Sequence, residues 1–407
     1  MNNPLLSVII PVKNNTNTLE YTLKTVLAQD YSNLQIIVSN ASNEDSVKDL
    51  INNLNDKRIK CVTPNESISF SADWEFALNG ADGEYVTFLG DDDAALPNSY
   101  SLGMSYILDN DVDAFVWKKI NYNWPDHLLP QSRNILNGSS SPEIQKINAK
   151  KALKQLSKFR VGYNFLPCIY NSIISVRDIK SVVKNSKKGT FFSGSVPDVY
   201  SGIALSSFIN KYYYASFPLT INGASVKSTG VIQSESNLTK DQTKQISFLI
   251  KTVDSYHKDI GEYSTSISSL IMGEYILARE NIAKFAGPKP SWFLYVRHLL
   301  HEVKTSNQSE KIIAAARFTI KKRGLFMPLF FIKTNSKMKK KYPASFFNGY
   351  FNLPVQKIKN VEDASILLGG LVPSKNSITI VNSKSILTRW TSNSIKTMID
   401  LYRSIKL

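Results

Sequence analysis

Short apolar runs alternate with segments of helical periodicity along the first 117 residues of the chain. The apolar runs are rich in β-branched residues and have the length of buried strands, whereas the segments between them repeat apolar residues every three or four positions. Strands are expected at 5–12, 34–38, 59–62, 85–89 and 113–117, and helices at 44–54, 71–79 and 98–108. Near-continuous apolar strands that alternate with helices predict an α/β fold with a mostly parallel sheet flanked by helices.

Polar side chains follow three of these expected strands. The first strand ends in a turn that is rich in asparagine and has no glycine, which excludes a glycine-rich dinucleotide-binding motif. The second ends at Ser39 and Asn40, and the fourth is followed by Asp91, Asp92 and Asp93. Ligands bind beyond the carboxyl ends of strands in open α/β sheets, so we expect these turns at the ligand-binding edge.

The three consecutive aspartates have two interpretations. Like charges this close repel one another, and a divalent cation, Mn²⁺ or Mg²⁺, offsets that repulsion. Aspartate is also a common turn residue, so a solvated acidic turn accounts for the same three side chains.

Charge divides the chain into two parts. Residues 1–225 contain 21 basic and 21 acidic residues, whereas residues 226–407 contain 28 and 12 and so carry the whole net charge of +16. A chain of 407 residues suits two domains better than one core. We therefore predict a neutral α/β domain at 1–225 and a basic, mainly helical domain at 226–407.

Two cysteines, Cys61 and Cys168, stand in apolar surroundings without the spacing of a disulfide framework or a zinc site. This usage is typical of the reducing cytosol. The amino terminus does not have the pattern of a signal peptide, and no run reaches the roughly 20 apolar residues of a membrane span. We expect a cytoplasmic protein that is soluble or peripheral at the inner face of the plasma membrane.

Three segments together resemble the family 2 glycosyltransferases of the GT-A fold: SVIIPVKNN at 7–15, LQIIVSNAS at 34–42 and ADGEYVTFLGDDD at 81–93. DWE at 73–75 resembles the bacterial polysaccharide branch of that family. The resemblance implies a metal-dependent, inverting transferase for surface polysaccharide such as O-antigen or capsule. Its donor would be a nucleotide-sugar, with a UDP-sugar favoured, and its acceptor a saccharide or a lipid-linked saccharide.

The resemblance also implies roles for individual residues. It places the nucleotide-sugar against Pro11, Val12, Lys13, Ser39, Asn40, Trp74, Glu75, Asp91 and Asp92, and the metal ion, Mn²⁺ or Mg²⁺, against Asp91 and Asp93. Ser39 and Asn40 depart from the family, which usually has an aspartate pair there that contacts the base and the ribose. Asparagine can hydrogen-bond the same groups but carries no charge.

A fourth aspartate, Asp198, follows Pro197 at the expected start of a helix. A carboxylate is favoured electrostatically at a helix amino terminus, so Asp198 can be a simple capping residue. The resemblance instead implies that Asp198 is the general base that takes the proton of the acceptor hydroxyl. Further along the chain, Ser225, Lys227 and Ser228 are candidates for contact with the pyrophosphate.

Residues 120–160 are polar and irregular in pattern, and we expect a loop or lid over the site there. Trp117, Tyr122 and Trp124 form either an aromatic platform for a sugar ring or ordinary packing at a sheet edge.

Residues 321–341 contain eight basic residues and no acidic residue around an apolar centre. Such a segment suits an anionic membrane surface, and a helix–loop–helix with a packed apolar centre is the alternative. The net charge of +16 also raises the possibility of a nucleic-acid-binding protein, but the neutral first half and its acidic loop argue against a nucleic-acid partner. A non-catalytic protein that binds a nucleotide-sugar is a further alternative, because Ser39 and Asn40 depart from the family.

Overall fold

The computed structural model describes residues 3–12, 15–41, 45–110, 112–228, 257–260, 266–303, 309–325 and 350–381. Lys13, a predicted site residue, lies outside these described residues, as does most of the basic segment 321–341.

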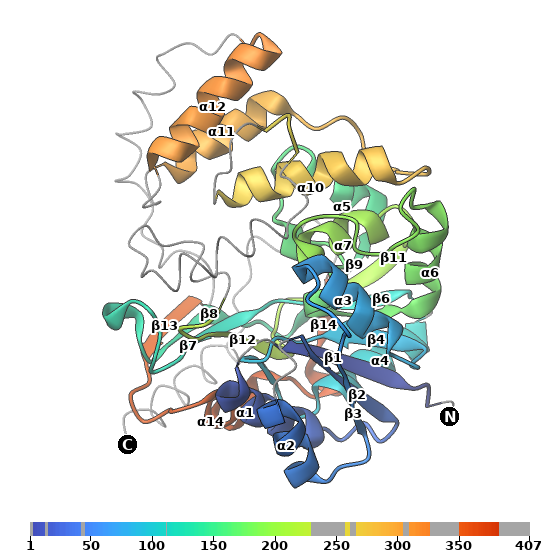
Figure 1. Cartoon of the computed structure of the whole chain (residues 1–407), viewed down its shortest axis with the longest axis vertical. Helices are drawn as coiled ribbons and strands as arrows, with labels where there is room; N and C mark the ends of the chain where they lie inside the picture. Colours follow the sequence, from blue (N-terminus) through green and yellow to red (C-terminus); the bar gives the residue numbers. More distant parts are fainter. Residues whose placement is uncertain are drawn as a thin grey trace.

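A nine-stranded sheet forms the centre of the molecule (Figure 1). Its strands, in spatial order, are β14 (Thr379–Ile380), β9 (Glu143–Asn148), β11 (Lys211–Ala215), β6 (Ala114–Trp117), β10 (Ser172–Ser175), β4 (Tyr85–Phe88), β1 (Leu6–Val12), β2 (Leu34–Asn40) and β3 (Ile59–Val62). β1 pairs in parallel with β2 and β4, and β2 pairs in parallel with β3. β10 is antiparallel to both of its neighbours, and β9 is antiparallel to β11. The predicted α/β fold is confirmed, with a mixed sheet.

Helices cover both faces of this sheet (Figure 1). Leu6, Val8 and Ile10 pack on one face and Ile9 on the other, and all four are fully buried. The helices of the first face are α1 (Thr16–Leu27), α2 (Asp45–Leu54) and α4 (Ser99–Asn110). Those of the second face are α3 (Phe70–Asn79), α5 (Ala149–Leu156), α6 (Val176–Asn185) and α7 (Pro197–Leu205). A strand covered on both faces needs the continuous apolar sequence that predicted β1.

The expectation of an irregular lid at 120–160 is wrong. This segment contains β7 (Ile120–Asn123), β8 (Ile135–Ser139), β9 and α5. β7 and β8 belong to a second sheet in the order β13 (Tyr350–Pro354), β8, β7, β12 (Thr220–Ala224), β5 (Ala94–Ala95). Trp117, Tyr122 and Trp124 are at most 6% exposed, so these rings pack in the protein and form no open platform.

The described residues beyond 225 form two groups of elements. α10 (Ile267–Asn281), α11 (Trp292–Glu302) and α12 (Ser309–Arg323) pack together, as the predicted helical character requires. β13, β14 and α14 (Val361–Leu368) instead join the α/β part: β13 pairs with β8, β14 pairs with β9, and α14 packs in the apolar cluster of β7 and β12. The predicted boundary at residue 225 therefore marks the change in net charge, but elements beyond it, β13, β14 and α14, pack with the α/β part.

Short 3-10 helices complete the fold, at Pro130–Ser132 (η1), Tyr163–Phe165 (η2), Ile169–Asn171 (η3), Gly369–Leu371 (η6) and Lys375–Ser377 (η7). Among the helices that the structure describes, none has the length and apolar content to cross a membrane.

Candidate active site

Parallel pairing brings the polar strand ends of the sequence to one edge of the sheet. Pro11 and Val12 of β1 lie beside Ser39 and Asn40 of β2 in register. The acidic loop follows β4, the other neighbour of β1. Asn15, just beyond β1, donates a hydrogen bond from Nδ2 to Oδ1 of Asp91 at 3.2 Å. The turns after β1, β2 and β4 thus form one edge, as the strand order predicts.

Asp93 is held inside the fold. Oδ2 accepts hydrogen bonds from Gly90 N at 2.7 Å and from the Tyr170 hydroxyl, and Oδ1 accepts one from Gly223 N at 2.7 Å. The side chain is 1% exposed. Burial, followed by the charge of Asp92, raises the pKa of Asp93 to about 7, although the donors from Tyr170, Gly223 and Gly90 act in the opposite direction.

Asp92 is also buried, and it joins the acidic loop to the end of β12. Its Oδ2 accepts hydrogen bonds from Ser225 N at 3.2 Å, Ser225 Oγ at 2.7 Å and the Ser228 hydroxyl. Burial raises the pKa of Asp92, and these donors lower it. β12 passes so closely that a Cβ on Gly223 would lie 1.7 Å from the Asp92 carbonyl oxygen, which explains the glycine there. Ser225 and Ser228 thus bond Asp92 and each other.

Asp91 is the most exposed of the three aspartates. The residues that the structure describes contain no group of three His, Cys, Asp or Glu side chains able to hold a metal ion. Mg²⁺ typically takes only one or two carboxylates and completes its shell with water and substrate phosphates. The oxygen donors at this edge suit such a shared site, in which Asp91 supplies the accessible carboxylate.

Ser39, which departs from the family pattern, contacts a carboxylate from another element of the fold. Ser39 Oγ donates a hydrogen bond of 2.6 Å to Oδ1 of Asp73 on α3, and both residues are buried. A carboxylate therefore lies beside the end of β2, although the sequence has none at 39 or 40. Asp73 is not among the site residues predicted from the sequence. A charged residue on the buried face of a helix is unusual, and Asp73 shares the buried face of α3 with Trp74, Ala77 and Leu78.

Trp74 and Glu75 serve contacts within the protein. The Trp74 ring stacks on Phe88 with centroids 4.7 Å apart, and it is 7% exposed. The Glu75 carboxylate accepts hydrogen bonds from Phe191 N and Phe192 N, the latter at 2.8 Å. Their binding of the nucleotide-sugar stays a prediction, and the described contacts of Glu75 instead hold the segment that precedes α7.

Asp198 lies in the first turn of α7, partly exposed, close to two tyrosines. The charge of Asp198 is the largest of the causes that raise the pKa of Tyr163. Tyr170, which donates to Asp93, also has a raised pKa; burial is the main cause, and the charges of Asp93, Asp92 and Asp198 add to it. Tyr170 therefore bonds the acidic loop directly, and its element, η3, packs against α7, the helix of Asp198. Lys119 Nζ lies 4.0 Å from the centre of the Tyr170 ring and brings a cation to this place.

Comparisons with known proteins agree with the motifs. Residues 7–167 match the family model "Glycosyl transferase family 2". A GalNAc(5)-diNAcBac-PP-undecaprenol beta-1,3-glucosyltransferase of Campylobacter jejuni is 39% identical over 101 residues, which cover 24% of this chain and 33% of that protein. An Escherichia coli UDP-Glc:alpha-D-GlcNAc-diphosphoundecaprenol beta-1,3-glucosyltransferase, WfaP, is 28% identical over 138 residues, which cover 34% of this chain and 52% of that protein.

Among solved structures, Staphylococcus aureus TarS 1–349 is 14% identical, with a TM-score of 0.44 over 80% of this chain and 93% of that chain. The chain spans a third to about half of the length of the two curated relatives. The family match covers β1 to α5 and includes the acidic loop. Residues 7–167 of this chain are therefore similar to glycosyl transferase family 2, the family that the three sequence motifs resemble.

Proposed function

We propose that this protein is an inverting glycosyltransferase of bacterial surface polysaccharide synthesis. It moves a sugar from a nucleoside-diphosphate sugar to a saccharide or lipid-linked acceptor. The observation that carries the proposal is the acidic loop at the sheet edge beside the ends of β1 and β2: Tyr170 donates to its Asp93, and η3, which holds Tyr170, packs against α7, the helix that bears Asp198. The names of both curated relatives describe acceptors linked to an undecaprenol diphosphate, and one names UDP-glucose as donor, which supports a lipid-linked acceptor and a UDP-sugar.

The proposed chemistry assigns different roles to Asp91 and Asp198. The donor diphosphate lies at the edge with Asp91, and the acceptor hydroxyl lies on the side of Asp198. Asp198 takes the proton of that hydroxyl while its oxygen forms a bond to the anomeric carbon. The bond from that carbon to the diphosphate breaks, and its electron pair leaves with the nucleoside diphosphate. Attack in line with the leaving group inverts the anomeric centre.

Asp91 would hold Mn²⁺ or Mg²⁺ together with the donor phosphates. When bound there, the cation offsets the charge that builds on the departing diphosphate. Asp93 and Asp92 keep the loop in place through Tyr170, Gly223 and Ser225. The predicted direct ligation by Asp93 is less favoured than ligation by Asp91, because three donors already surround the Asp93 carboxylate.

Asp73 supplies the charge that Ser39 and Asn40 lack, and accepts a hydrogen bond from the ribose or the base. Replacing Asp73 with asparagine is expected to weaken binding of UDP about tenfold to a hundredfold, since hydrogen bonds to charged groups contribute about 1.5–3 kcal/mol. Isothermal titration with UDP measures this effect. Asp82→Asn is the matched control, because Asp82 lies in the turn before β4 and accepts a hydrogen bond from Gln35. Equal affinities of Asp73→Asn and wild type would remove Asp73 from the donor site.

The proposed function is tested by transfer itself. Purified protein is incubated with a set of UDP-sugars and a GDP-sugar, Mn²⁺, and a synthetic acceptor that carries a saccharide on a diphosphate lipid. Release of nucleoside diphosphate and mass spectrometry of the acceptor report the reaction, and NMR of the product reports the anomeric configuration. Inversion is expected with at least one donor. Retention of configuration, or nucleotide binding without transfer to any acceptor, would contradict the proposal.

The membrane is the remaining partner of the proposed function. An acceptor carried on a lipid must be met at the bilayer, and the net charge of +16 favours an anionic surface. The basic segment that suggested this contact lies outside the described residues beyond Leu325.

A further inference from the structure

The segment that leads into α7 is held by side chains from two directions. From α3, Ser71 Oγ donates a hydrogen bond to Gly194 O at 2.7 Å, and Glu75 accepts from the backbone of Phe191 and Phe192. From α10, Glu274 Oε1 accepts hydrogen bonds from Ser195 N at 2.9 Å and Val196 N at 3.0 Å. α3 lies next to the proposed donor site, whereas α10 belongs to the chain beyond the family match.

Glu274 holds the two residues that precede the first turn of α7, a helix without a side-chain cap. Val196 is the N-cap residue and has no side-chain oxygen, and Pro197 follows at the first helical position without an N–H group. The N–H groups of Ser195 and Val196 come before the helix and lie outside its own hydrogen-bond ladder, and a carboxyl group from another element accepts from both. Glu274 occupies that place, and Asp198 is the next residue of the helix after Pro197.

The fit around Glu274 is tight. Its side chain is 3% exposed, and Oε2 has no hydrogen-bond partner among the residues that the structure describes. A Cβ on Gly194 would lie 1.8 Å from that oxygen, so residue 194 must be glycine for the segment to pass. A buried polar atom without a partner is costly, and such atoms persist where a function requires them.

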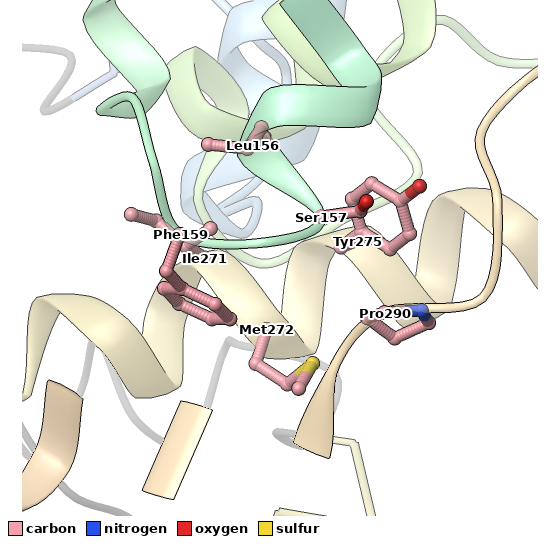
Figure 2. A pocket seen from close by; sticks show the side chains of 7 residues that line it. All are labelled: Leu156, Ser157, Phe159, Ile271, Met272, Tyr275 and Pro290. Atoms are coloured by element: carbon pink, nitrogen blue, oxygen red, sulfur yellow. The ribbon is translucent and has the colours of Figure 1, made fainter. Parts of the chain in front are cut away.

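α10 is a firm support for Glu274. Figure 2 shows Ile271, Met272 and Tyr275 of α10 facing Leu156 and Phe159 at the end of α5. About two turns after Glu274, Asn281 Nδ2 donates a hydrogen bond to the Tyr200 hydroxyl of α7 at 3.1 Å. The helix is thus fixed to the α/β part on both sides of Glu274.

We propose that Glu274 is a positioning residue for Asp198, so that the helical C-terminal part completes the active site instead of serving only as an appendage. The proposal rests on the proposed function, in which Asp198 is the base. Glu274 fixes the backbone of Ser195 and Val196 and thereby the direction in which the first turn of α7 presents Asp198.

Glu274 does this as a neutral acid at neutral pH. Burial, with a smaller contribution from the charge of Asp198, raises the pKa of Glu274 to about 8, although the two backbone donors and Lys188 act in the opposite direction. Tyr200 of α7 faces the same carboxyl group. A proton on Oε2 keeps a second negative charge away from Asp198, while Oε1 still accepts from the backbone.

Kinetics of two variants test the positioning role. Glu274→Ala leaves the two donors unpaired, and we expect kcat to fall about tenfold or more with little change in the KM for the donor. Glu274→Gln keeps the acceptor oxygen without a charge, and we expect it to restore most of the kcat at pH 7. The control is Glu302→Ala, which removes an acceptor for Ser268 N at the start of α10, far along the chain from α7. An unchanged kcat in Glu274→Ala, or an equal fall in Glu302→Ala, would overturn the role.

Two measurements on the same variants do not depend on activity. Amide hydrogen exchange at Ser195 and Val196 is expected to accelerate in Glu274→Ala and not in Glu274→Gln. The folded state holds a proton on Glu274 that the unfolded chain loses above the ordinary pKa of 4.5, so the midpoint of thermal unfolding of wild type should fall relative to Glu274→Gln as the pH rises from 4.5 to about 8. A constant difference over that window would overturn the neutral state. If exchange responds as expected but wild type transfers no sugar, the proposed function is at fault and not the contact.

Discussion

Replacing Asp198 with asparagine is expected to lower kcat about a hundredfold to ten-thousandfold, the usual contribution of a general base. The amide has the size of the carboxyl group but cannot take the proton of the acceptor hydroxyl. The donor edge with Asp91 and Asp73 is unchanged in this variant, so the affinity for UDP should stay that of wild type. The measurements are the steady-state rate of sugar transfer and isothermal titration with UDP.

The alternative role of Asp198, a charge at a helix amino terminus, makes a different prediction. It contributes about 0.3–1 kcal/mol to stability and nothing to kcat. Asp178 is a matched control, because it lies in the first turn of α6, which begins at the opposite edge of the sheet beside the start of β4. Asp178→Asn should leave transfer intact. If kcat falls by a similar factor in both variants, or if Asp198→Asn keeps the kcat of wild type, Asp198 is a capping residue and not the base.

The α/β fold could be predicted because its signals are local. β1 and β2 are covered on both faces, so their sequences are nearly continuous apolar runs. The helices that alternate with the strands each have one apolar face. The prediction for 120–160 was wrong because β7 alternates buried Ile120 and Tyr122 with partly exposed asparagines. The strands that complete this part of the sheet, β12 beside β7 and β13 beside β8, come much later in the chain. A short strand of four residues has little pattern of its own when distant strands decide its burial.

The candidate site was predictable where one strand end carries its own chemistry, as at Asp91 to Asp93. It was not predictable where tertiary contacts bring side chains together. Tyr170 reaches Asp93 across 77 positions of sequence, and Glu274 reaches Ser195 across 79. No spacing rule connects such residues. Three consecutive aspartates do not reveal from sequence which of them are buried. The fold buries Asp92 and Asp93 and leaves Asp91 partly exposed.

The difference in burial between Asp91 and Asp93 predicts different defects when each is replaced by asparagine. Asp91→Asn should fold normally but lose the tightening of UDP binding by Mn²⁺, because the amide is a poor ligand for the cation. We expect binding about tenfold to a hundredfold weaker than wild type in Mn²⁺, or ~1.4–2.8 kcal/mol, and equal to wild type without metal. Isothermal titration with UDP in Mn²⁺ and in chelator measures both values.

Asp93→Asn should lose stability instead. Either orientation of the amide turns its NH₂ group towards a backbone donor, Gly90 N on one side or Gly223 N on the other. An unpaired buried donor costs about 1–3 kcal/mol, which urea unfolding would show as a lower free energy of unfolding with an unchanged slope. The fraction that stays folded should still respond to Mn²⁺. If Asp93→Asn unfolds like wild type yet no longer responds to Mn²⁺, while Asp91→Asn still responds, then Asp93 ligates the metal as the family resemblance implies. The packing around Asp93 would then have to open when the donor binds.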